Sequence, residues 1–370
     1  MFWFPLSTLE VVGLLSVSML LTKIIRLILV YISPSRLDRF AHLSQYGETP
    51  WALVTGASDG IGRAYAHELA AKGFNVVLHG RNSEKLSRVR SELSLTHPQR
   101  HFKILVADAS TVACGPCLRK GESGERLLDF NKIKRELEGL HLTVLVNNAG
   151  GAPVDPVCQS IANSSELHIA ENISLNALFP LQLTRALLPM LQQNSPSLII
   201  NMSTMIDSGF PLLASYSASK RFLMAITNAL QLEMQVDGWG KDIEILGIKV
   251  GRVTGARGHK HPVSLFVPDA TMMARAVLSR AGRGSKIVAG YWAHAIQQVG
   301  CELLDLFPDS VRNKVYIDQM LEEKAAHEEV IPEAKKADTV DYGVSILTKP
   351  AVGEVLQIYR RRLSVMKLEI

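Results

Sequence analysis

The chain has 370 residues, of which 47% are hydrophobic and 20% are charged, enough for one large α/β domain with appendages. Its 26 glycines and 16 prolines exclude collagen-like and disordered compositions. The net charge of +5 includes no basic run interleaved with aromatic residues, so nucleic-acid binding is not expected. This weak basicity suits an anionic cofactor or an acidic membrane surface. Four cysteines are too few for a disulfide framework and indicate a reducing compartment.

The amino-terminal segment is expected to form an apolar helix over Val11–Ile32, interrupted only by Lys23 and Arg26. At ~1.5 Å per residue, a helix of this length can cross a hydrocarbon core of ~30 Å. The cations share one helix face near the end of the segment, where long side chains can reach the interface. We therefore expect residues 1–32 to be a membrane anchor, either spanning the bilayer or lying in its plane; an ordinary buried helix is the alternative.

The charges around this segment predict its orientation. Only one acid, Glu10, precedes the apolar core, whereas four cations follow its centre: Lys23, Arg26, Arg36 and Arg39. Because cytoplasmic flanks carry the excess of lysine and arginine, everything after Ser33 is expected to face the cytosol. Three glycosylation sequons are then chance matches, at Asn163, Asn172 and Asn201.

Short apolar runs bounded by turns predict the buried strands of a parallel sheet. They are Trp51–Thr55, Asn75–His79, Lys103–Ala107, Thr143–Val146 and Leu198–Met202. Helical patterns separate these runs, for example Arg63–Lys72 with Gly73 at its end. Strands that alternate with helices predict a doubly wound α/β domain of the Rossmann type.

The first strand leads into a glycine-rich turn, Gly56-Ala57-Ser58-Asp59-Gly60-Ile61-Gly62. Between a strand and a helix, such a turn places a pyrophosphate against free N–H groups at the helix amino terminus. Gly56 permits the tight turn, Gly60 the close approach of the phosphate, and Gly62 the packing of helix on strand. The cofactor is expected to contact Gly56, Ser58, Gly60, Ile61 and Gly62.

Residues after the next three strands predict which nucleotide binds. NAD-selective sites carry an acid after the second strand, whereas this chain has Arg81 there and no acid before Glu84. The planar guanidinium of Arg81 can bind a 2′-phosphate, so NADPH is the expected cofactor; a solvated loop cation is the alternative. Asp108, after the third strand, is placed to accept a hydrogen bond from the adenine amino group. Asn148, after the fourth, is expected to border the cofactor.

Polar residues that follow the fifth strand are typical of carbonyl reduction. Ser203 comes directly after this strand, and Tyr216 and Lys220 share one face of a helix that continues over Phe222–Glu233. Hydride addition to a carbonyl leaves an alkoxide that must be protonated, and a free tyrosine, with a pKa of ~10, is poorly matched to neutral pH. A nearby lysine ammonium lowers that pKa and can hold the nicotinamide ribose. Ser203 is expected to polarise the substrate oxygen, and Asn176 to hold a water that relays protons to Lys220.

In this order, the motifs resemble the short-chain dehydrogenase/reductase superfamily from about Thr49 to Pro308. Four segments are similar to one branch, the microsomal very-long-chain 3-oxoacyl-CoA reductases and their 17β-hydroxysteroid dehydrogenase relatives: Thr55–Ala66, Pro211–Tyr216, Leu265–Pro268 and Gly290–Ala295. The resemblance implies NADPH-dependent reduction of a 3-oxoacyl-CoA in fatty acid elongation, on the cytosolic face of the endoplasmic reticulum. It also implies a nicotinamide contact at Val253 and leaves open a homo-oligomer or elongation-complex partners.

Several features depart from the family pattern and keep the substrate open. Val250 stands where the superfamily has proline, an insertion runs over Cys114–Gly124, and the end of the chain, Met366–Ile370, lacks a dilysine signal. A lipophilic ketone such as a steroid, polyketide or terpenoid is therefore an alternative to the acyl-CoA substrate. A catalytically silent membrane scaffold is the alternative from another class of protein.

We predict four regions along the chain: the membrane anchor 1–32, a linker 33–48, the reductase domain 49–308 and a helical, charged extension 309–370. Residues 255–279 take the place of a substrate lid. Its cationic residues could meet a CoA phosphate or form a solvated loop: Arg257, His259, Lys260 and His261. Because these histidines lack the ligand spacing of a metal site, no metal is expected.

Overall fold

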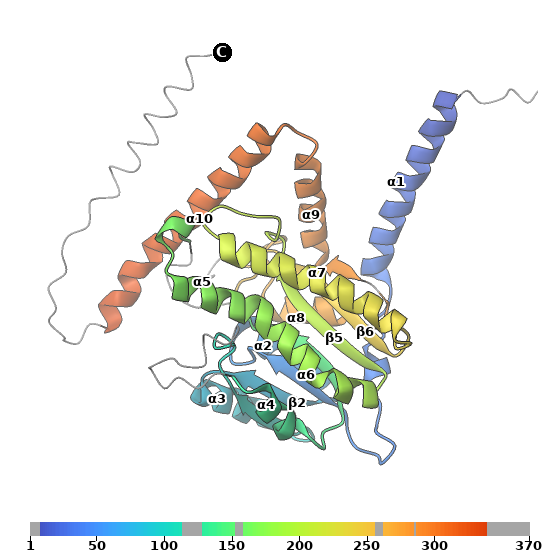
Figure 1. Ribbon diagram of the computed structural model, residues 1–370, viewed down its shortest axis with the longest axis vertical. Helices are drawn as coiled ribbons and strands as arrows, with labels where there is room; N and C mark the ends of the chain where they lie inside the picture. The colour runs from blue at the N-terminus through green and yellow to red at the C-terminus, as the bar shows by residue number, and fades with distance from the viewer. Residues whose placement is uncertain (1–7, 113–127, 152–157, 256–261, 285, 339–370) are drawn as a thin grey trace, which may run out of the picture. The chain divides into compact units, whose positions relative to one another are not determined.

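The computed structural model describes residues 8–112, 128–151, 158–255, 262–284 and 286–338 (Figure 1). Some predicted features lie outside these ranges: the insertion Cys114–Gly124 and the lid residues Arg257, His259, Lys260 and His261. The chain divides into two compact units, Met1–Ala325 and Ala326–Ile370. The sheet and the site both belong to the first unit.

Within the described residues, seven strands form one parallel sheet in the order β3-β2-β1-β4-β5-β6-β7. They are β1 Trp51–Thr55, β2 Asn75–Gly80, β3 Phe102–Val106, β4 Leu142–Asn147, β5 Ser197–Thr204, β6 Ile243–Val250 and β7 Ile287–Ala289. The chain starts mid-sheet, builds outward to β3, then crosses back to β4 and builds outward in the other direction. This confirms the predicted doubly wound topology, which binds ligands beyond the carboxyl ends of its strands at the reversal point.

Helices pack on both faces of the sheet (Figure 1). The helices of the described residues are α1 Thr8–Ile32, α2 Gly60–Ala71, α3 Ser83–Thr96, α4 Phe130–Leu137, α5 Glu166–Ile173, α6 Phe179–Gln193, α7 Ala214–Val236, α8 Ala270–Leu278, α9 Trp292–Leu304 and α10 Asp309–Asp338. Alternate strand residues point to opposite faces. Val54 and Leu78 thus lie in a core with residues of α2, α3 and α8, whereas Leu53 and Val77 lie in a core with residues of α4, α6 and α7. The strands are mainly apolar because both faces of the sheet are covered.

The helix that carries the candidate catalytic pair contains both residues, as predicted. α7 starts at Ala214, so Tyr216 and Lys220 lie in its first turns. Its first residues are small or polar and show no apolar periodicity, and Leu213 at the cap position offers no side-chain hydrogen bond to mark the start. The sequence therefore lacked the usual signals of a helix amino terminus.

The amino-terminal helix α1 is largely exposed, and from Glu10 to Ile32 it is long and apolar enough to cross a membrane. The predicted linker that follows is partly built into the domain. Leu37 and Phe40, in a short 3-10 helix, are buried in the core formed with α2, α3 and α8. The carbonyl oxygen of Phe40 also accepts a hydrogen bond from the hydroxyl of Thr143 in β4 (2.8 Å). These contacts fix the point where the chain enters the domain.

Candidate active site

In the glycine turn between β1 and α2, two glycines adopt backbone angles that favour glycine, and a third leaves no room for a side chain. Gly56 and Gly60 have φ angles of +67° and +52°, in the left-handed region that glycine adopts at no steric cost. A Cβ on Gly62 would lie 2.1 Å from the carbonyl oxygen of Gly56 and 2.7 Å from Nδ2 of Asn148, so no side chain fits there. The Asp59 carboxylate, which the sequence interpretation did not single out, accepts a hydrogen bond from the N–H of Gly60 (2.8 Å). The turn thus brings the start of α2 against the end of β1, where helix N–H groups can bind phosphate.

Residues expected to select the nucleotide gather around Gly80, the last residue of β2. The Ser58 hydroxyl lies 3.6 Å from the Cβ position of Gly80, whose carbonyl oxygen accepts a hydrogen bond from Ala107. Next to Gly80, Arg81 is exposed and makes no hydrogen bond or ion pair with any described residue. Asp108 accepts hydrogen bonds from the N–H and hydroxyl of Ser110 (2.9 and 2.8 Å), both through one carboxylate oxygen. A glycine cradle beside an unpaired guanidinium fits a nucleotide that carries a 2′-phosphate.

The turn after β4 is fixed to β1 by Thr55, which the sequence interpretation missed. The Thr55 hydroxyl accepts hydrogen bonds from the N–H groups of Asn148 and Ala149 (2.9 Å each) and donates one to Val146. The Asn148 amide donates to the carbonyl oxygen of Thr55 (2.9 Å). Asn147 donates to Asn201 in β5 (2.8 Å), so side chains link the three central strands where they end.

Ser203, Tyr216 and Lys220 meet where β5 ends and α7 begins. The Ser203 hydroxyl donates a hydrogen bond to the carbonyl oxygen of Lys220 (3.2 Å). The Nζ of Lys220 donates to the carbonyl oxygen of Met202 (2.9 Å), and the hydroxyl of Tyr216 is hydrogen-bonded to the side chain of Thr204. The three side chains predicted to carry the chemistry are therefore gathered at the end of one strand.

Asn176 approaches the same place through a π-helical turn, Ser174–Leu178, between α5 and α6. Its Oδ1 accepts a hydrogen bond from the N–H of Gly151 (3.0 Å), and its Nδ2 donates to the carbonyl oxygen of the same residue (2.9 Å). A Cβ on Gly150 would lie 2.7 Å from Nζ of Lys220 and 2.9 Å from Oδ1 of Asn176. The two side chains thus converge on the turn expected to border the cofactor. Single π turns inside helices are frequent at functional sites.

Burial sets the protonation of the central pair. It raises the pKa of Tyr216 to about 12, and the hydrogen bond with Thr204 only partly opposes this shift. It lowers the pKa of Lys220 to about 8. The expected lowering of the Tyr216 pKa by Lys220 is not found here, because the ammonium is turned toward Met202 and no charge offsets the burial of the phenol. A phenol with this pKa is protonated at neutral pH and is therefore able to donate a proton.

The segment after β6 is held by His294 of α9, whose role the sequence did not indicate. The Nδ1 of this buried imidazole accepts a hydrogen bond from the N–H of Gly251 (3.1 Å), and a Cβ on Gly251 would lie 2.9 Å from the ring. Val253, the predicted nicotinamide contact, has its side chain in the hydrophobic core. Arg252, which lies between Gly251 and Val253 in the sequence, forms an ion pair with Glu323 of α10.

A small apolar cluster forms on the loop that precedes Tyr216. Its buried members are Cys158, Phe210 and Met320. Met320 belongs to α10, and Tyr316 of the same helix has its ring 4.5 Å from that of Phe210. Leu212, in this loop, has a φ of +64°, a conformation that costs a branched side chain free energy. The predicted extension from residue 309 is therefore not separate from the domain, because the first half of α10 packs on the loop that leads to Tyr216.

Together, the topology, the glycine turn and the Ser203–Tyr216–Lys220 group define a nicotinamide-dependent oxidoreductase of the Rossmann class. A family model described as short chain dehydrogenase matches residues 50–261, and the chain belongs to this family. Its members are oxidoreductases acting on CH–OH groups, so this chain is an enzyme and not a silent scaffold.

Curated relatives include the very-long-chain 3-oxoacyl-CoA reductase of Phaeosphaeria nodorum. It is 32% identical over 267 residues, which cover 69% of this chain and 72% of that protein. A protein of the same name from Coccidioides immitis is 31% identical, over 70% of this chain and 71% of its own length. Among solved structures, the Sphingobium yanoikuyae short-chain dehydrogenase in complex with NADPH has a TM-score of 0.54 at 20% identity, covering 81% of this chain and 100% of that one. That likeness concerns the fold.

Proposed function

We propose that this protein reduces a 3-oxoacyl-CoA to the 3-hydroxyacyl-CoA with NADPH, in very-long-chain fatty acid elongation. The observation that carries the proposal is the convergence of Ser203, Tyr216 and Lys220 at the end of β5, beside the turn that follows β4. It is supported by the relatives named very-long-chain 3-oxoacyl-CoA reductase, which are about one-third identical to this chain.

In this proposal the bound cofactor supplies the hydride that the substrate carbonyl carbon accepts. Ser203 donates a hydrogen bond to the carbonyl oxygen and stabilises the charge that develops there. Tyr216 gives its phenolic proton to the resulting alkoxide, since a pKa of about 12 keeps it protonated at neutral pH. In this proposal Lys220 holds the nicotinamide ribose and, once its ammonium turns from the carbonyl oxygen of Met202 toward Tyr216, stabilises the tyrosinate that remains. Asn176, near the Lys220 ammonium, holds the water through which Tyr216 is reprotonated.

The preference for NADPH rests on the surroundings of β2. Arg81 is exposed and has no partner among the described residues, so its guanidinium is available to a 2′-phosphate. Ser58 offers a further hydroxyl close to Gly80, the residue before Arg81. The remaining proposed contacts are the glycine turn with Ile61 for the pyrophosphate, Asp108 for the adenine, and Asn148 and Val253 for the nicotinamide end.

We also propose that α1 anchors the enzyme in the endoplasmic reticulum membrane with its catalytic domain in the cytosol. The support is the exposed, apolar surface of α1 from Glu10 to Ile32 and the cations that follow its centre. A cytosolic domain would have direct access to NADPH and to acyl-CoA. Assembly of the enzyme with itself or with other elongation enzymes is also part of the proposal, although no contact among the described residues identifies a partner.

A second substrate class is favoured by the apolar cluster behind the loop that precedes Tyr216. Phe210 and Met320 are buried and Tyr316 is partly exposed, so this loop has an apolar backing that would tolerate the rings of a steroid, polyketide or terpenoid as well as an acyl chain. The purified full chain should therefore be assayed for NADPH oxidation with long-chain 3-oxoacyl-CoA and with a steroid ketone. Formation of 3-hydroxyacyl-CoA by wild type and its loss in Tyr216→Phe would support the first proposal. Turnover of the steroid alone would favour the second.

A further inference from the structure

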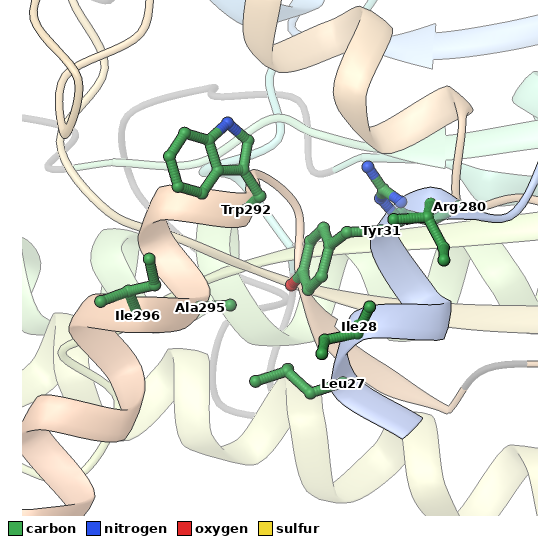
Figure 2. Close-up of a pocket in the computed structure, with 8 residues that line it drawn as sticks. Leu27, Ile28, Tyr31, Arg280, Trp292, Ala295 and Ile296 are labelled. Carbon is green, nitrogen blue, oxygen red and sulfur yellow. The ribbon is translucent and has the colours of Figure 1, made fainter. Parts of the chain in front are cut away.

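The end of α1 and the start of α9 face each other across a pocket of about 430 Å³ (Figure 2). This volume is within the range of sites that hold small apolar ligands. The lining is almost entirely hydrocarbon: α1 contributes Leu27, Ile28 and Tyr31, and α9 contributes Trp292, Ala295 and Ile296. None of these residues belongs to the candidate active site, so the pocket needs an explanation of its own.

Polar contacts at the inner end of the pocket hold the end of α1 against the domain. The hydroxyl of Tyr31 donates a hydrogen bond to the carbonyl oxygen of Ala289 (2.7 Å). The guanidinium of Arg280 lies 4.5 Å from the centre of the Tyr31 ring and donates to the carbonyl oxygen of Val30. Arg283 donates to the carbonyl oxygen of Pro34 (3.2 Å). These contacts join the end of α1 to the catalytic domain beside the pocket.

Beyond the pocket, α9 presents an uncovered apolar face. Trp292, Ile296, Val299 and Leu303 follow one another at helical spacing, and each has at least 40% of its surface exposed. In the first turn of the helix, the residues between these positions are buried in the domain: Ala293, His294 and Ala295. The exposed row begins at the residues that line the pocket and is therefore continuous with the apolar surface of α1.

A membrane accounts for this arrangement better than water does. The apolar surface of α1 requires hydrocarbon around it, and α9 meets α1 at its last turn, where a spanning helix leaves the hydrocarbon core. Tyrosine and arginine, as in the Tyr31–Arg280 pair, collect at that boundary because each combines an apolar body with a polar end. We propose that the exposed face of α9 rests in the membrane interface and that an acyl chain of a bilayer lipid fills the pocket. The inference rests on the proposed anchoring by α1.

A lipid in this pocket would also bear on the active site. Ala295 faces the pocket, whereas its neighbour His294 accepts the hydrogen bond of Gly251 in the segment that leads to Val253. One turn of α9 therefore separates the proposed lipid from the proposed nicotinamide contact. The proposed lipid site and the cofactor segment therefore share the first turn of α9.

The test uses the full chain in phosphatidylcholine nanodiscs with acyl chains brominated near the headgroup, which quench nearby tryptophan. Two variants are compared: Trp3→Phe and the double variant Trp3→Phe/Trp292→Phe. The difference between their fluorescence gives the emission of Trp292. Trp3 is replaced in both because it comes just before the apolar segment in the sequence. We expect brominated lipid to lower the Trp292 emission by about two-fold or more, because an interfacial tryptophan lies beside the acyl chains.

A matched pair of variants separates the pocket from a general surface effect. Ile296 in α9 and Leu232 in α7 are both 53% exposed. Ile296→Glu should abolish most of the quenching, because a carboxylate resists burial in hydrocarbon. Leu232→Glu should leave the quenching unchanged. Equal quenching in both variants would contradict a lipid-filled pocket.

Other outcomes are equally decisive. Quenching of Trp292 by aqueous acrylamide but not by lipid would place α9 in water, and shielding from both together with cross-linking between copies would make the face a protein interface. Either result overturns the inference. NADPH oxidation with 3-oxoacyl-CoA is measured in the same discs. Turnover without lipid quenching rejects the lipid site alone, whereas lipid quenching without turnover supports the site and rejects the proposed reaction.

Discussion

Gly150 and Lys220 lie so close together that a Cβ on the glycine would come within 2.7 Å of the lysine Nζ. The same Cβ would lie 2.9 Å from Oδ1 of Asn176. The ammonium therefore occupies its position, donating to the carbonyl oxygen of Met202, only because residue 150 has no side chain. A turn far from Lys220 in the sequence thus decides where its charge is held.

The variant Gly150→Ala should consequently displace the Lys220 ammonium without disturbing the core. We expect kcat to fall by ~10-fold or more, since small misplacements of a positioned group can cost ~10²-fold. The melting temperature should change little, because Gly150 is exposed and has a negative φ. Gly300→Ala is the control: nothing lies within 4 Å of its Cβ position. Equal kcat values in Gly150→Ala and wild type would show that the Lys220 position is not critical.

Substitutions of the candidate catalytic side chains should give distinct patterns. Tyr216→Phe keeps the ring but removes the transferable proton, so turnover should fall by ~10²-fold or more while NADPH affinity stays within a few-fold. Lys220→Met should lose both rate and NADPH affinity, because the ammonium has two proposed tasks. Ser203→Ala should lower the rate alone. Steady-state kinetics and NADPH titration separate these cases. Full activity in Tyr216→Phe would require another proton donor.

Arg81 should determine the choice of nucleotide. Wild type is expected to bind NADPH at least ~10-fold more tightly than NADH, because a guanidinium–phosphate contact is charge-assisted and bidentate. Arg81→Asp should remove most of that difference by repelling the 2′-phosphate. Arg90→Asp makes the same charge change at an exposed position of α3, the helix that follows Arg81. This control should leave the ratio of NADPH to NADH affinity unaltered. Equal wild-type affinities for the two nucleotides would contradict the proposed role of Arg81.

The sequence predicted the parts of the site that depend on local geometry. Gly56 and Gly62 were identifiable because a tight turn and a close helix contact exclude side chains, and Tyr216 and Lys220 because their spacing places them on one helix face. The topology followed from apolar strands that alternate with helices. The sequence did not locate the first residue of α7, since neither periodicity nor a capping residue such as serine or aspartate marks it; Leu213 stands at the cap position instead.

Contacts between distant segments could not be predicted. His294 matters because α9 folds back onto Gly251, and Met320 because α10 packs on Phe210. Nothing near either residue in the sequence signals these contacts. The raised pKa of Tyr216 likewise depends on burial and on where the Lys220 ammonium points, which only the folded arrangement determines.

The pH dependence of activity should follow Lys220. Burial lowers its pKa to about 8, so its ammonium is lost as the pH rises through that value, before Tyr216 with a pKa of about 12 ionises. If the charge holds the ribose and stabilises tyrosinate, kcat/KM for ketone reduction should decline above about pH 8. Lys220→Arg, whose guanidinium stays charged, should lack this decline even at a lower rate. A profile that is flat from pH 7 to about 10 in wild type would contradict the assignment.

Stability toward acid should depend on His79, in the middle of the fold. Its ring is fully buried in β2 and stacked on Phe179, with 5.0 Å between ring centres, and neither ring nitrogen has a partner among the described residues. Burial therefore lowers its pKa from 6.5 to about 4, although the carboxylate of Asp108 opposes the shift. The native state is therefore more stable with the His79 imidazole neutral than with it protonated.

Because the unfolded chain binds this proton more readily, the stabilising contribution is complete above pH 6.5 and is lost as the pH falls toward about 4. The loss should amount to ~3 kcal/mol, taking 1.36 kcal/mol per pKa unit. His79→Phe keeps a ring stacked on Phe179 and removes the titrating group. The unfolding free energy of both proteins is measured in detergent from pH 7 down to about pH 4.5. Over this range the variant should lose less unfolding free energy, relative to its own value at pH 7, than wild type does. Parallel pH curves for the two proteins would show that His79 is not the residue whose protonation destabilises the fold.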